Sequence, residues 1–140
     1  MSFLLDTNVI SEWTRPRPNP GMIQWLAEVD EDRVVISVIT LAELRHGVER
    51  LPAGKRRTRL DEWLREELPV RFEGRILPVD EATAHACGVI VAQREAIGRP
   101  IHAMDALIAA TAKTRRLTVV TRNADDFAPS VDAINPWKAD

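Results

Sequence analysis

Four carboxylate side chains occupy positions from which they could act together: Asp6, Glu43, Asp105 and Asp126. Clustered carboxylates raise one another's pKa values unless a cation lies among them. Hard oxygen ligands of this kind favour Mg²⁺ or Mn²⁺ over zinc, and the sequence contains no cluster of Cys and His that would compete for a metal. A divalent cation held by such acids can activate a water against a phosphodiester and stabilise the leaving oxygen. The residue types therefore indicate metal-assisted hydrolysis.

The segments that precede these acids predict how they would be brought together. Apolar runs at residues 3–5, 34–37 and 117–121 are typical of strands that are buried on both faces. The first run stops at Asp6, and the last stops at the polar stretch 122–127. In an open parallel sheet, ligands bind beyond the carboxyl ends of the strands. The sequence thus places its acids at the edge of the sheet where chemistry usually occurs.

Helical patterns fill the sequence between the strands. Helices are expected over residues 7–13, 22–29, 41–48, 51–68, 80–97 and 102–114, with short additional strands within 72–77 and at 131–134. Within 80–97, helical spacing predicts one apolar face formed by Ala82, Ala86, Val89, Ile90, Gln93 and Ile97. Strands that alternate with helices indicate right-handed crossovers. We therefore predict an α/β fold with a central, mainly parallel sheet covered on both faces, in a single domain over residues 1–140.

Composition limits the classes of protein that the chain can belong to. Of its 140 residues, 45% are hydrophobic and 29% are charged, and the net charge is −2. This excludes a strongly basic, duplex-coating protein but not a nucleic-acid enzyme with an acidic metal site. The single Cys87 cannot form an internal disulfide, which favours a reducing compartment. Asp6 interrupts the N-terminal apolar stretch and no apolar run approaches the roughly 18 residues of a membrane span, so we expect a cytoplasmic protein without a membrane segment.

Each acid also has a purely structural interpretation. Asp6 could cap the helix that follows it, although Thr7 or Asn8 could also be the cap. Glu43 could complete a capping box with Thr40, and Asp105 could complement the positive end of its helix dipole. Asp126, like its neighbour Asp125, could form a turn. The apolar surroundings of Asp105 in the sequence argue against a simple surface acid, and His102 is best interpreted as a helix cap.

Four segments of the chain, in order, resemble PIN-domain ribonucleases, in particular the VapC toxins of bacterial toxin–antitoxin pairs and their FitB-like branch. The segments are Leu4-Leu5-Asp6-Thr7-Asn8, Thr40-Leu41-Ala42-Glu43-Leu44, residues 105–112 (DALIAATA) and residues 121–127 (TRNADDF). No single motif is specific, but the combination at compatible spacing is. The resemblance covers essentially the whole chain.

This resemblance implies a three-layer α/β/α fold and Mg²⁺- or Mn²⁺-dependent cleavage of RNA. It implies that Asp6, Glu43 and Asp105 are the metal ligands, with Asp126 as a weaker ligand. The polar groups around them would be Thr7, Asn8, Thr121 and Asn123, and whether Asn123 or Asp126 fills the fourth acidic position stays open. The resemblance also implies a homodimer and inhibition by a small antitoxin, whose C-terminal segment covers the acidic site, often with an arginine.

Two other functions remain compatible with these residues. In a phosphatase or phospho-acceptor domain, Asp6 would form an aspartyl-phosphate, but such sites usually need a second acid very close to the first, and here Thr7 and Asn8 follow. Alternatively, the chain could be a binding module whose acidic pocket only holds the basic tail of a partner.

Overall fold

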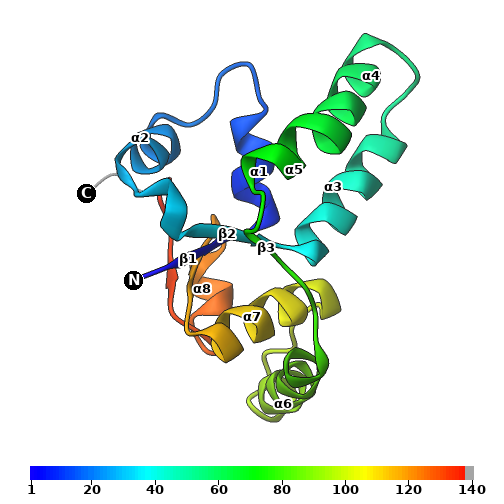
Figure 1. Ribbon diagram of the computed structural model, residues 1–140. Helices are drawn as coiled ribbons and strands as arrows, with labels where there is room; N and C mark the ends of the chain where they lie inside the picture. Colours follow the sequence, from blue (N-terminus) through cyan, green and yellow to red (C-terminus); the bar gives the residue numbers. More distant parts are fainter. Residues whose placement is uncertain (138–140) are drawn as a thin grey trace.

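Five parallel strands form a sheet that lies between two layers of helices (Figure 1). The computed structural model describes residues 1–137. The strands are ordered β3-β2-β1-β4-β5, with β1 at Phe3–Leu5, β2 at Val34–Ser37, β3 at Ile76–Leu77, β4 at Thr118–Val120 and β5 at Ala133–Ile134. The order places the first strand in the centre, between the second and the fourth. The predicted α/β fold with a parallel central sheet is confirmed.

The helices divide between the two faces of the sheet (Figure 1). One layer contains α1 (Thr7–Trp13), α2 (Pro20–Glu28), α3 (Val38–Arg50), α4 (Lys55–Glu62) and α5 (Leu68–Arg71), with a 3-10 turn at Glu31–Arg33 and a π-helical turn at Trp63–Glu67. The other layer contains α6 (Glu81–Ala96), α7 (Ala103–Arg115) and α8 (Ala124–Phe127). Within residues 1–137, no helix combines the length and the apolar character needed to cross a membrane.

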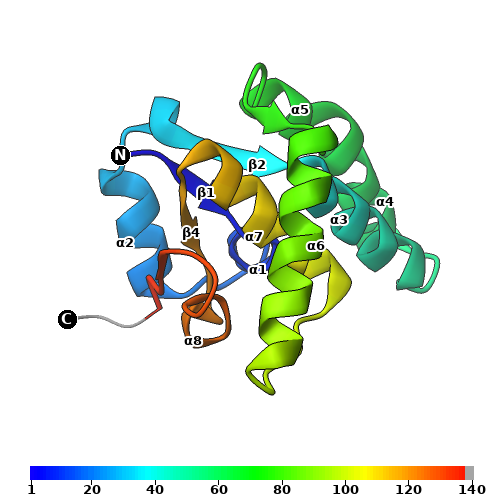
Figure 2. The same cartoon turned by 90° about the horizontal axis from the view of Figure 1, so that it is seen from below.

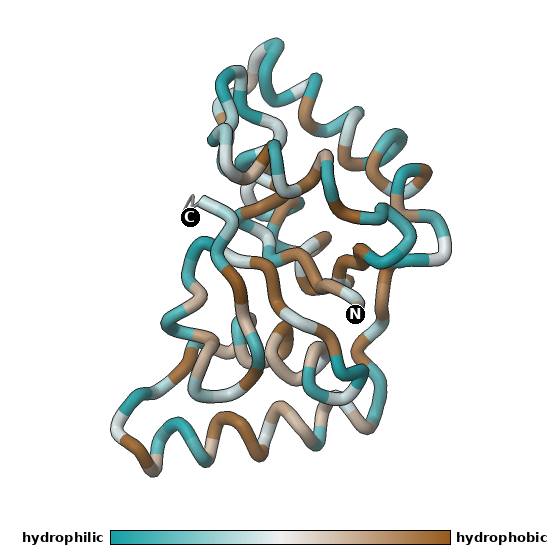
Figure 3. The backbone as a smooth tube through the Cα atoms, turned by 90° about the vertical axis from the view of Figure 1, so that its left-hand side faces the viewer, coloured by the Kyte–Doolittle hydropathy of each residue, from teal (hydrophilic) through white to brown (hydrophobic). Residues whose placement is uncertain are grey.

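Alternate side chains of the central strands enter two separate cores. Leu5 and Val120 pack with α1 to α5, whereas Leu4 and Val119 pack with α6, α7 and α8. Successive side chains of a strand point to opposite faces, so a strand covered on both faces must be apolar throughout. The backbone coloured by hydropathy shows the strands as a hydrophobic centre (Figure 3). This explains why the sequence of each central strand lacks polar alternation.

Small side chains allow α7 to pack closely beneath the sheet. Ala106, Ala109, Ala110 and Ala112 are fully buried, and α7 packs extensively against α6 (Figure 2). The predicted apolar face of α6 is wrong in part. Of that set, Ile90 is buried and Ala86 is half-buried, but Val89 is 53% and Ile97 is 58% exposed, while Thr83 and Arg94 are buried instead.

The structure decides between the alternatives that the sequence offered for the starts of two helices. The N-cap of α1 is Asp6, whose carboxylate accepts a hydrogen bond from the backbone N–H of Thr7, so neither Thr7 nor Asn8 is the cap. The N-cap of α3 is Ser37, whose hydroxyl accepts from the N–H of Ile39. Because α3 begins one residue after β2 ends, no capping box forms between Thr40 and Glu43. Both side chains remain available for other contacts.

The C-terminal part of the chain returns to the start of α2. A Cβ atom on Gly21 would lie 2.6 Å from the carbonyl oxygen of Pro136, so the absence of a side chain at Gly21 permits this close approach. The following residue, Trp137, reaches the hollow described next. The stretch 123–127, for which the sequence predicted a turn, forms the single helical turn of α8.

Candidate functional site

A hollow of about 310 Å³ opens beyond the carboxyl ends of the central strands, and three of the four predicted acids line it. Asp6 directly follows β1, Glu43 lies on α3 after β2, and Asp105 lies in the first turn of α7. Residues from three elements distant in sequence therefore meet at one edge of the sheet. The lining residues are Asp6, Thr7, Asn8, Ser11, Glu12, Arg15, Glu43, Asp105, Arg122, Asn123 and Trp137.

Asp6 is the most deeply buried of the three acids, with 4% of its surface exposed. Its Oδ1 accepts from the N–H of Thr7 at 2.8 Å, and its Oδ2 accepts from the hydroxyl of Thr121 at 2.8 Å and the amide of Asn8 at 3.3 Å. Burial raises the pKa of Asp6 to about 6, and the charges of Asp105 and Glu43 act in the same direction. The hydrogen bonds from Thr121 and Thr7 oppose this rise in pKa without cancelling it.

Glu43 is held by a hydroxyl from the neighbouring helix. The side-chain oxygen of Thr7 lies 2.6 Å from Oε1 of Glu43 and 3.1 Å from the hydroxyl of Thr40. Thr7 therefore contacts two of the acids, since its backbone N–H binds Asp6 and its hydroxyl binds Glu43. This arrangement fixes α1 and α3 relative to each other at the site.

Asp105 begins the helix that approaches from the other face of the sheet. Burial raises its pKa, the charges of Glu43 and Asp126 add to the rise, and His102 opposes it. The predicted cap role of His102 is confirmed, because its Nδ1 accepts from the N–H of Met104 at 3.2 Å. Asp105 is half-buried, so it is not simply a solvated acid that complements the helix dipole.

Two residues, Asn123 and Asp126, were candidates for the fourth acidic position, and they lie in different places. Asn123 lines the hollow, whereas Asp126 lies one turn further along α8, is exposed and does not line it. Asp126 still acts at a distance, because its charge raises the pKa of Asp105. The structure thus places an amide at the hollow and the carboxylate behind it.

Thr121 and Asn8 connect β4 to Asp6. The hydroxyl of Thr121 is fully buried, donates to Asp6 and accepts from the N–H of Asn123 at 3.0 Å and the amide of Asn8 at 3.3 Å. The Asn8 side-chain oxygen in turn accepts from the N–H of Arg122. These polar residues orient the carboxylate and fix the loop after β4.

Sequence reasoning missed five residues of the hollow: Ser11, Glu12, Arg15, Arg122 and Trp137. Glu12 is buried, accepts from the N–H of Asn19 at 2.9 Å and lies 3.3 Å from the guanidinium of Arg15. A helical signal existed, because Asn8, Glu12 and Arg15 are spaced four and three residues apart on one face. No comparable signal existed for Trp137, whose place depends on the return of the C-terminal segment.

The donor atoms of the hollow fit a hard divalent cation. They are carboxylate and amide oxygens, which suit Mg²⁺ or Mn²⁺. Burial, together with neighbouring acids, raises the pKa values of Asp6 and Asp105, and a cation would offset this electrostatic cost. Among residues 1–137, however, no three His, Cys, Asp or Glu side chains already converge as a metal centre. The acids share a hollow, and a cation would have to draw their carboxylates together.

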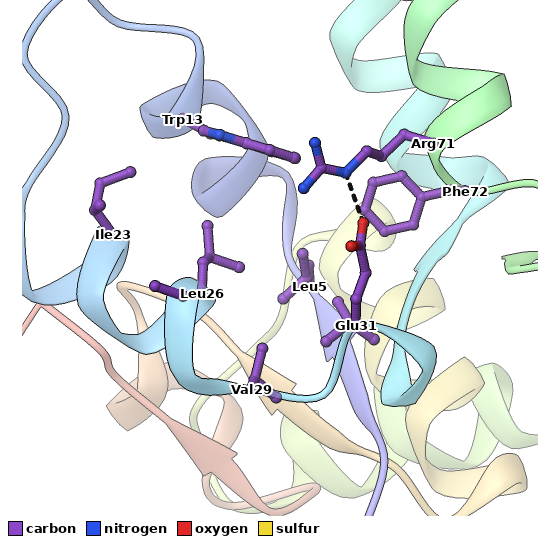
Figure 4. A pocket seen from close by; sticks show the side chains of 10 residues that line it. Leu5, Trp13, Ile23, Leu26, Val29, Glu31, Arg71 and Phe72 are labelled. Carbon is purple, nitrogen blue, oxygen red and sulfur yellow. Dashed lines mark hydrogen bonds and ion pairs between the residues drawn. The ribbon is translucent and has the colours of Figure 1, made fainter.

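A second, apolar hollow of about 310 Å³ lies between α1, α2 and α5. Figure 4 shows Arg71 beside the ring of Trp13 and hydrogen-bonded to Glu31 over an apolar floor. Helix α1 thus supplies Trp13 to this hollow and Glu12 to the acidic one. The other residues around it are Leu5, Ile23, Leu26, Ala27, Val29, Val34 and Phe72.

Comparison with known proteins agrees with this architecture. The PIN domain family matches residues 3–129. The toxin FitB of Neisseria gonorrhoeae is 46% identical over 135 residues, covering 96% of this chain and 97% of FitB. The VapC ribonuclease Y4jK of Sinorhizobium fredii is 38% identical over 136 residues, covering 96% and 97%.

Solved structures extend the match to three dimensions. The structure of FitAB bound to an IR36 DNA fragment superposes with a TM-score of 0.92 at 42% identity, covering 99% of this chain and 97% of that one. VapBC-5 of Mycobacterium tuberculosis, a member of the VapBC family of toxin–antitoxin systems, superposes with a TM-score of 0.67 at 30% identity, covering 96% and 98%. With its fold, the order of its motifs and its relatives in agreement, the chain belongs to the PIN-domain family.

Proposed function

We propose that this protein is a Mg²⁺- or Mn²⁺-dependent endoribonuclease that acts as the toxin of a type II toxin–antitoxin system. The observation that carries the proposal is the shared hollow of Asp6, Glu43 and Asp105 beyond the central strands. The relatives named as FitB toxin and VapC ribonuclease support both the toxin role and RNA as substrate.

In this proposal, Asp6, Glu43 and Asp105 hold the cation, and Asn123 and Asp126 stand at the fourth position. A bound Mg²⁺ or Mn²⁺ supplies Lewis acidity, which makes a water more acidic and neutralises charge that develops on the phosphate. The side chains around the acids hold these groups in position. Thr7 and Thr121 orient the carboxylates through the hydrogen bonds described above, and Arg15 and Arg122 at the rim bring positive charge near an RNA backbone.

Purified protein should cleave RNA when Mg²⁺ or Mn²⁺ is supplied and should stop when the metal is chelated. Asp6→Asn removes one metal ligand while keeping the size of the side chain, so we expect cleavage of a labelled RNA to fall below detection. Asp32→Asn, on an exposed turn, is the matched control and should cleave as the parent does. Metal-independent cleavage that survives Asp6→Asn would refute the proposal.

The phosphatase alternative is disfavoured by the surroundings of Asp6. Both carboxylate oxygens accept hydrogen bonds and the residue is 4% exposed, which leaves a poor nucleophile. Mass measurement after incubation with a small phosphoryl donor would reveal any aspartyl-phosphate.

If the chain is instead only a binding module, any toxicity on expression should not depend on cleavage of RNA. Growth arrest on expression that Glu43→Gln relieves would instead favour the enzyme.

The proposed partner is a small antitoxin whose C-terminal segment covers the acidic hollow with an arginine. A guanidinium would pair with carboxylates for the same electrostatic reason that a cation binds there. The apolar hollow on the other side of α1 (Figure 4) offers a place for apolar side chains of the same partner. The proposal includes a cytoplasmic homodimer, and light scattering during size-exclusion chromatography would test the dimer.

A further inference from the structure

Thr40 is a fully buried threonine of α3 whose hydroxyl forms its hydrogen bond with a residue outside that helix. Threonines inside helices commonly satisfy their hydroxyl on the carbonyl four residues earlier. Thr111 and Thr114 of α7 do so, donating to Leu107 at 2.8 Å and Ala110 at 3.0 Å. Thr40 instead reaches across to Thr7 of α1 at 3.1 Å, and within residues 1–137 this is the only hydrogen bond that its side chain makes.

The direction of this contact follows from Glu43. A carboxylate only accepts hydrogen bonds, so at 2.6 Å the hydroxyl of Thr7 must be the donor to Glu43. A hydroxyl has one proton, which Thr7 has then already used. Thr40 must therefore donate to Thr7, and the three side chains form a relay in which Thr40 donates to Thr7 and Thr7 donates to Glu43.

We propose that Thr40 is a positioning residue for the cation-binding carboxylate of Glu43 and acts through Thr7. A threonine side chain occupies discrete staggered rotamers, and the bond from Thr40 selects the rotamer of Thr7 that points its proton at Oε1 of Glu43. Oε1 is thereby occupied, and the lone pairs of Oε2 remain for a cation. The inference rests on the proposed function, in which Glu43 is a metal ligand.

The relay also explains why Thr40 has this residue type. A capping role is excluded because Ser37 is the N-cap of α3. An apolar residue of the same shape, such as valine, would fill the same buried space between α1 and α3 but would leave the rotamer of Thr7 unselected. Thr40 is thus needed for its hydroxyl, beyond its volume.

The test compares Thr40→Val, which removes the hydroxyl at nearly constant shape, with Thr40→Ser, which keeps it. Binding of Mn²⁺ alone is measured by electron paramagnetic resonance, and kcat and KM are measured for RNA cleavage. Loss of a group that orients a metal ligand typically weakens metal binding or activity by about 10- to 100-fold. We expect Thr40→Val to weaken Mn²⁺ binding at least about tenfold and to lower kcat with little change in KM, and Thr40→Ser to restore both.

Thr111→Val is the matched control, because it makes the same substitution at another fully buried helical threonine whose hydroxyl stays within its helix. It should bind Mn²⁺ as the parent does. A double-mutant cycle with Thr7→Val tests the route of the effect: if Thr40 acts through Thr7, adding Thr40→Val to Thr7→Val causes no further loss. If Thr40→Val does not fold, Thr40→Ala, which also lacks the hydroxyl, takes its place in the comparison with Thr40→Ser.

Unchanged Mn²⁺ binding by Thr40→Val, equal loss in Thr40→Val and Thr40→Ser, or additive losses in the cycle would each overturn the inference. These results are distinguishable from failure of the proposed function. If the parent protein cleaves RNA with metal and Glu43→Gln does not, the function stands whatever Thr40 does. If the parent neither binds Mn²⁺ nor cleaves RNA, the proposed function itself fails.

Discussion

At the residue scale, the carboxyl group of Asp6 carries the largest electrostatic cost in the site. Burial and two neighbouring acids raise its pKa from 3.8 to about 6. An acid with a raised pKa in the folded state binds more protons folded than unfolded, so stability falls as pH rises from about 4 to 6 and the penalty is complete above pH 6. About two pKa units correspond to about 3 kcal/mol.

We therefore expect Asp6→Asn to stabilise the metal-free protein at pH 8 by up to about 3 kcal/mol. The gain should shrink as pH falls through 6 and should be small near pH 4, where Asp6 is protonated in the folded state and about half protonated in the unfolded state. Urea unfolding in the presence of chelator at pH 4, 6 and 8 measures this. Asp32→Asn is the control and should change the unfolding free energy by less than about 0.5 kcal/mol at each pH. A pH-independent gain for Asp6→Asn would contradict the electrostatic explanation.

At the element scale, α8 is one helical turn and needs an external anchor. Arg94 of α6 provides it: this arginine is 4% exposed, its Nη1 donates to the carbonyl of Asp126 at 2.8 Å, and its Nε donates to the carbonyl of Arg99 at 2.8 Å. A buried cation near the end of a helix satisfies carbonyls that the helix leaves open. Arg94 thus fixes the segment that carries Asn123 and Asp126.

Arg94→Met should destabilise the protein by about 2 kcal/mol, because hydrogen bonds to a charged group contribute about 1.5–3 kcal/mol and the carbonyls would be left unpaired. Hydrogen exchange should accelerate first at residues 124–131. Arg99→Met is the matched control, since Arg99 is exposed and makes one long contact of 3.3 Å to Asp125; it should cost less than about 0.5 kcal/mol. Equal effects of the two substitutions would show that burial of Arg94 has no special role.

At the scale of the whole molecule, the acidic hollow joins α1, α3, α7 and the loop after β4, so its charge affects global stability. A cation that binds only the folded state stabilises it by about 2.7 kcal/mol at 100 times its Kd. Protons compete with the cation for Asp6, whose pKa is about 6. Metal binding should therefore weaken as pH falls below 6.

We expect saturating Mn²⁺ to raise the midpoint of thermal unfolding by several degrees at pH 8 and by much less at pH 5, and chelator to reverse the shift. Differential scanning calorimetry measures both. Asp105→Asn should reduce the shift at pH 8, because it removes one proposed ligand while leaving the fold intact. If the midpoint of Asp105→Asn shifts by the same amount as that of the parent, Asp105 does not bind the metal.

The sequence by itself determined the sheet and its acidic edge. Runs such as Val34–Ser37 lack polar alternation because both faces are covered, and this physical requirement is visible in any short window of residues. The same local logic predicted the cap role of His102, whose Nδ1 accepts from the N–H of Met104. Asp6, Glu43 and Asp105 were recognisable because each lies at a strand end or an early helical turn.

Only the tertiary structure decided which side chains meet across elements. Helical spacing on α6 favoured Val89 and Ile97 as inward residues, but Thr83 and Arg94 are buried instead. The Thr83 hydroxyl donates to the carboxylate of Asp80, and Arg94 donates to the carbonyl of Asp126. The place of Trp137 and the contact of Thr40 with Thr7 depend on segments far apart in sequence. Hydrogen bonds and packing between distant segments leave no periodic signature along the chain, so they are fixed only when the chain folds.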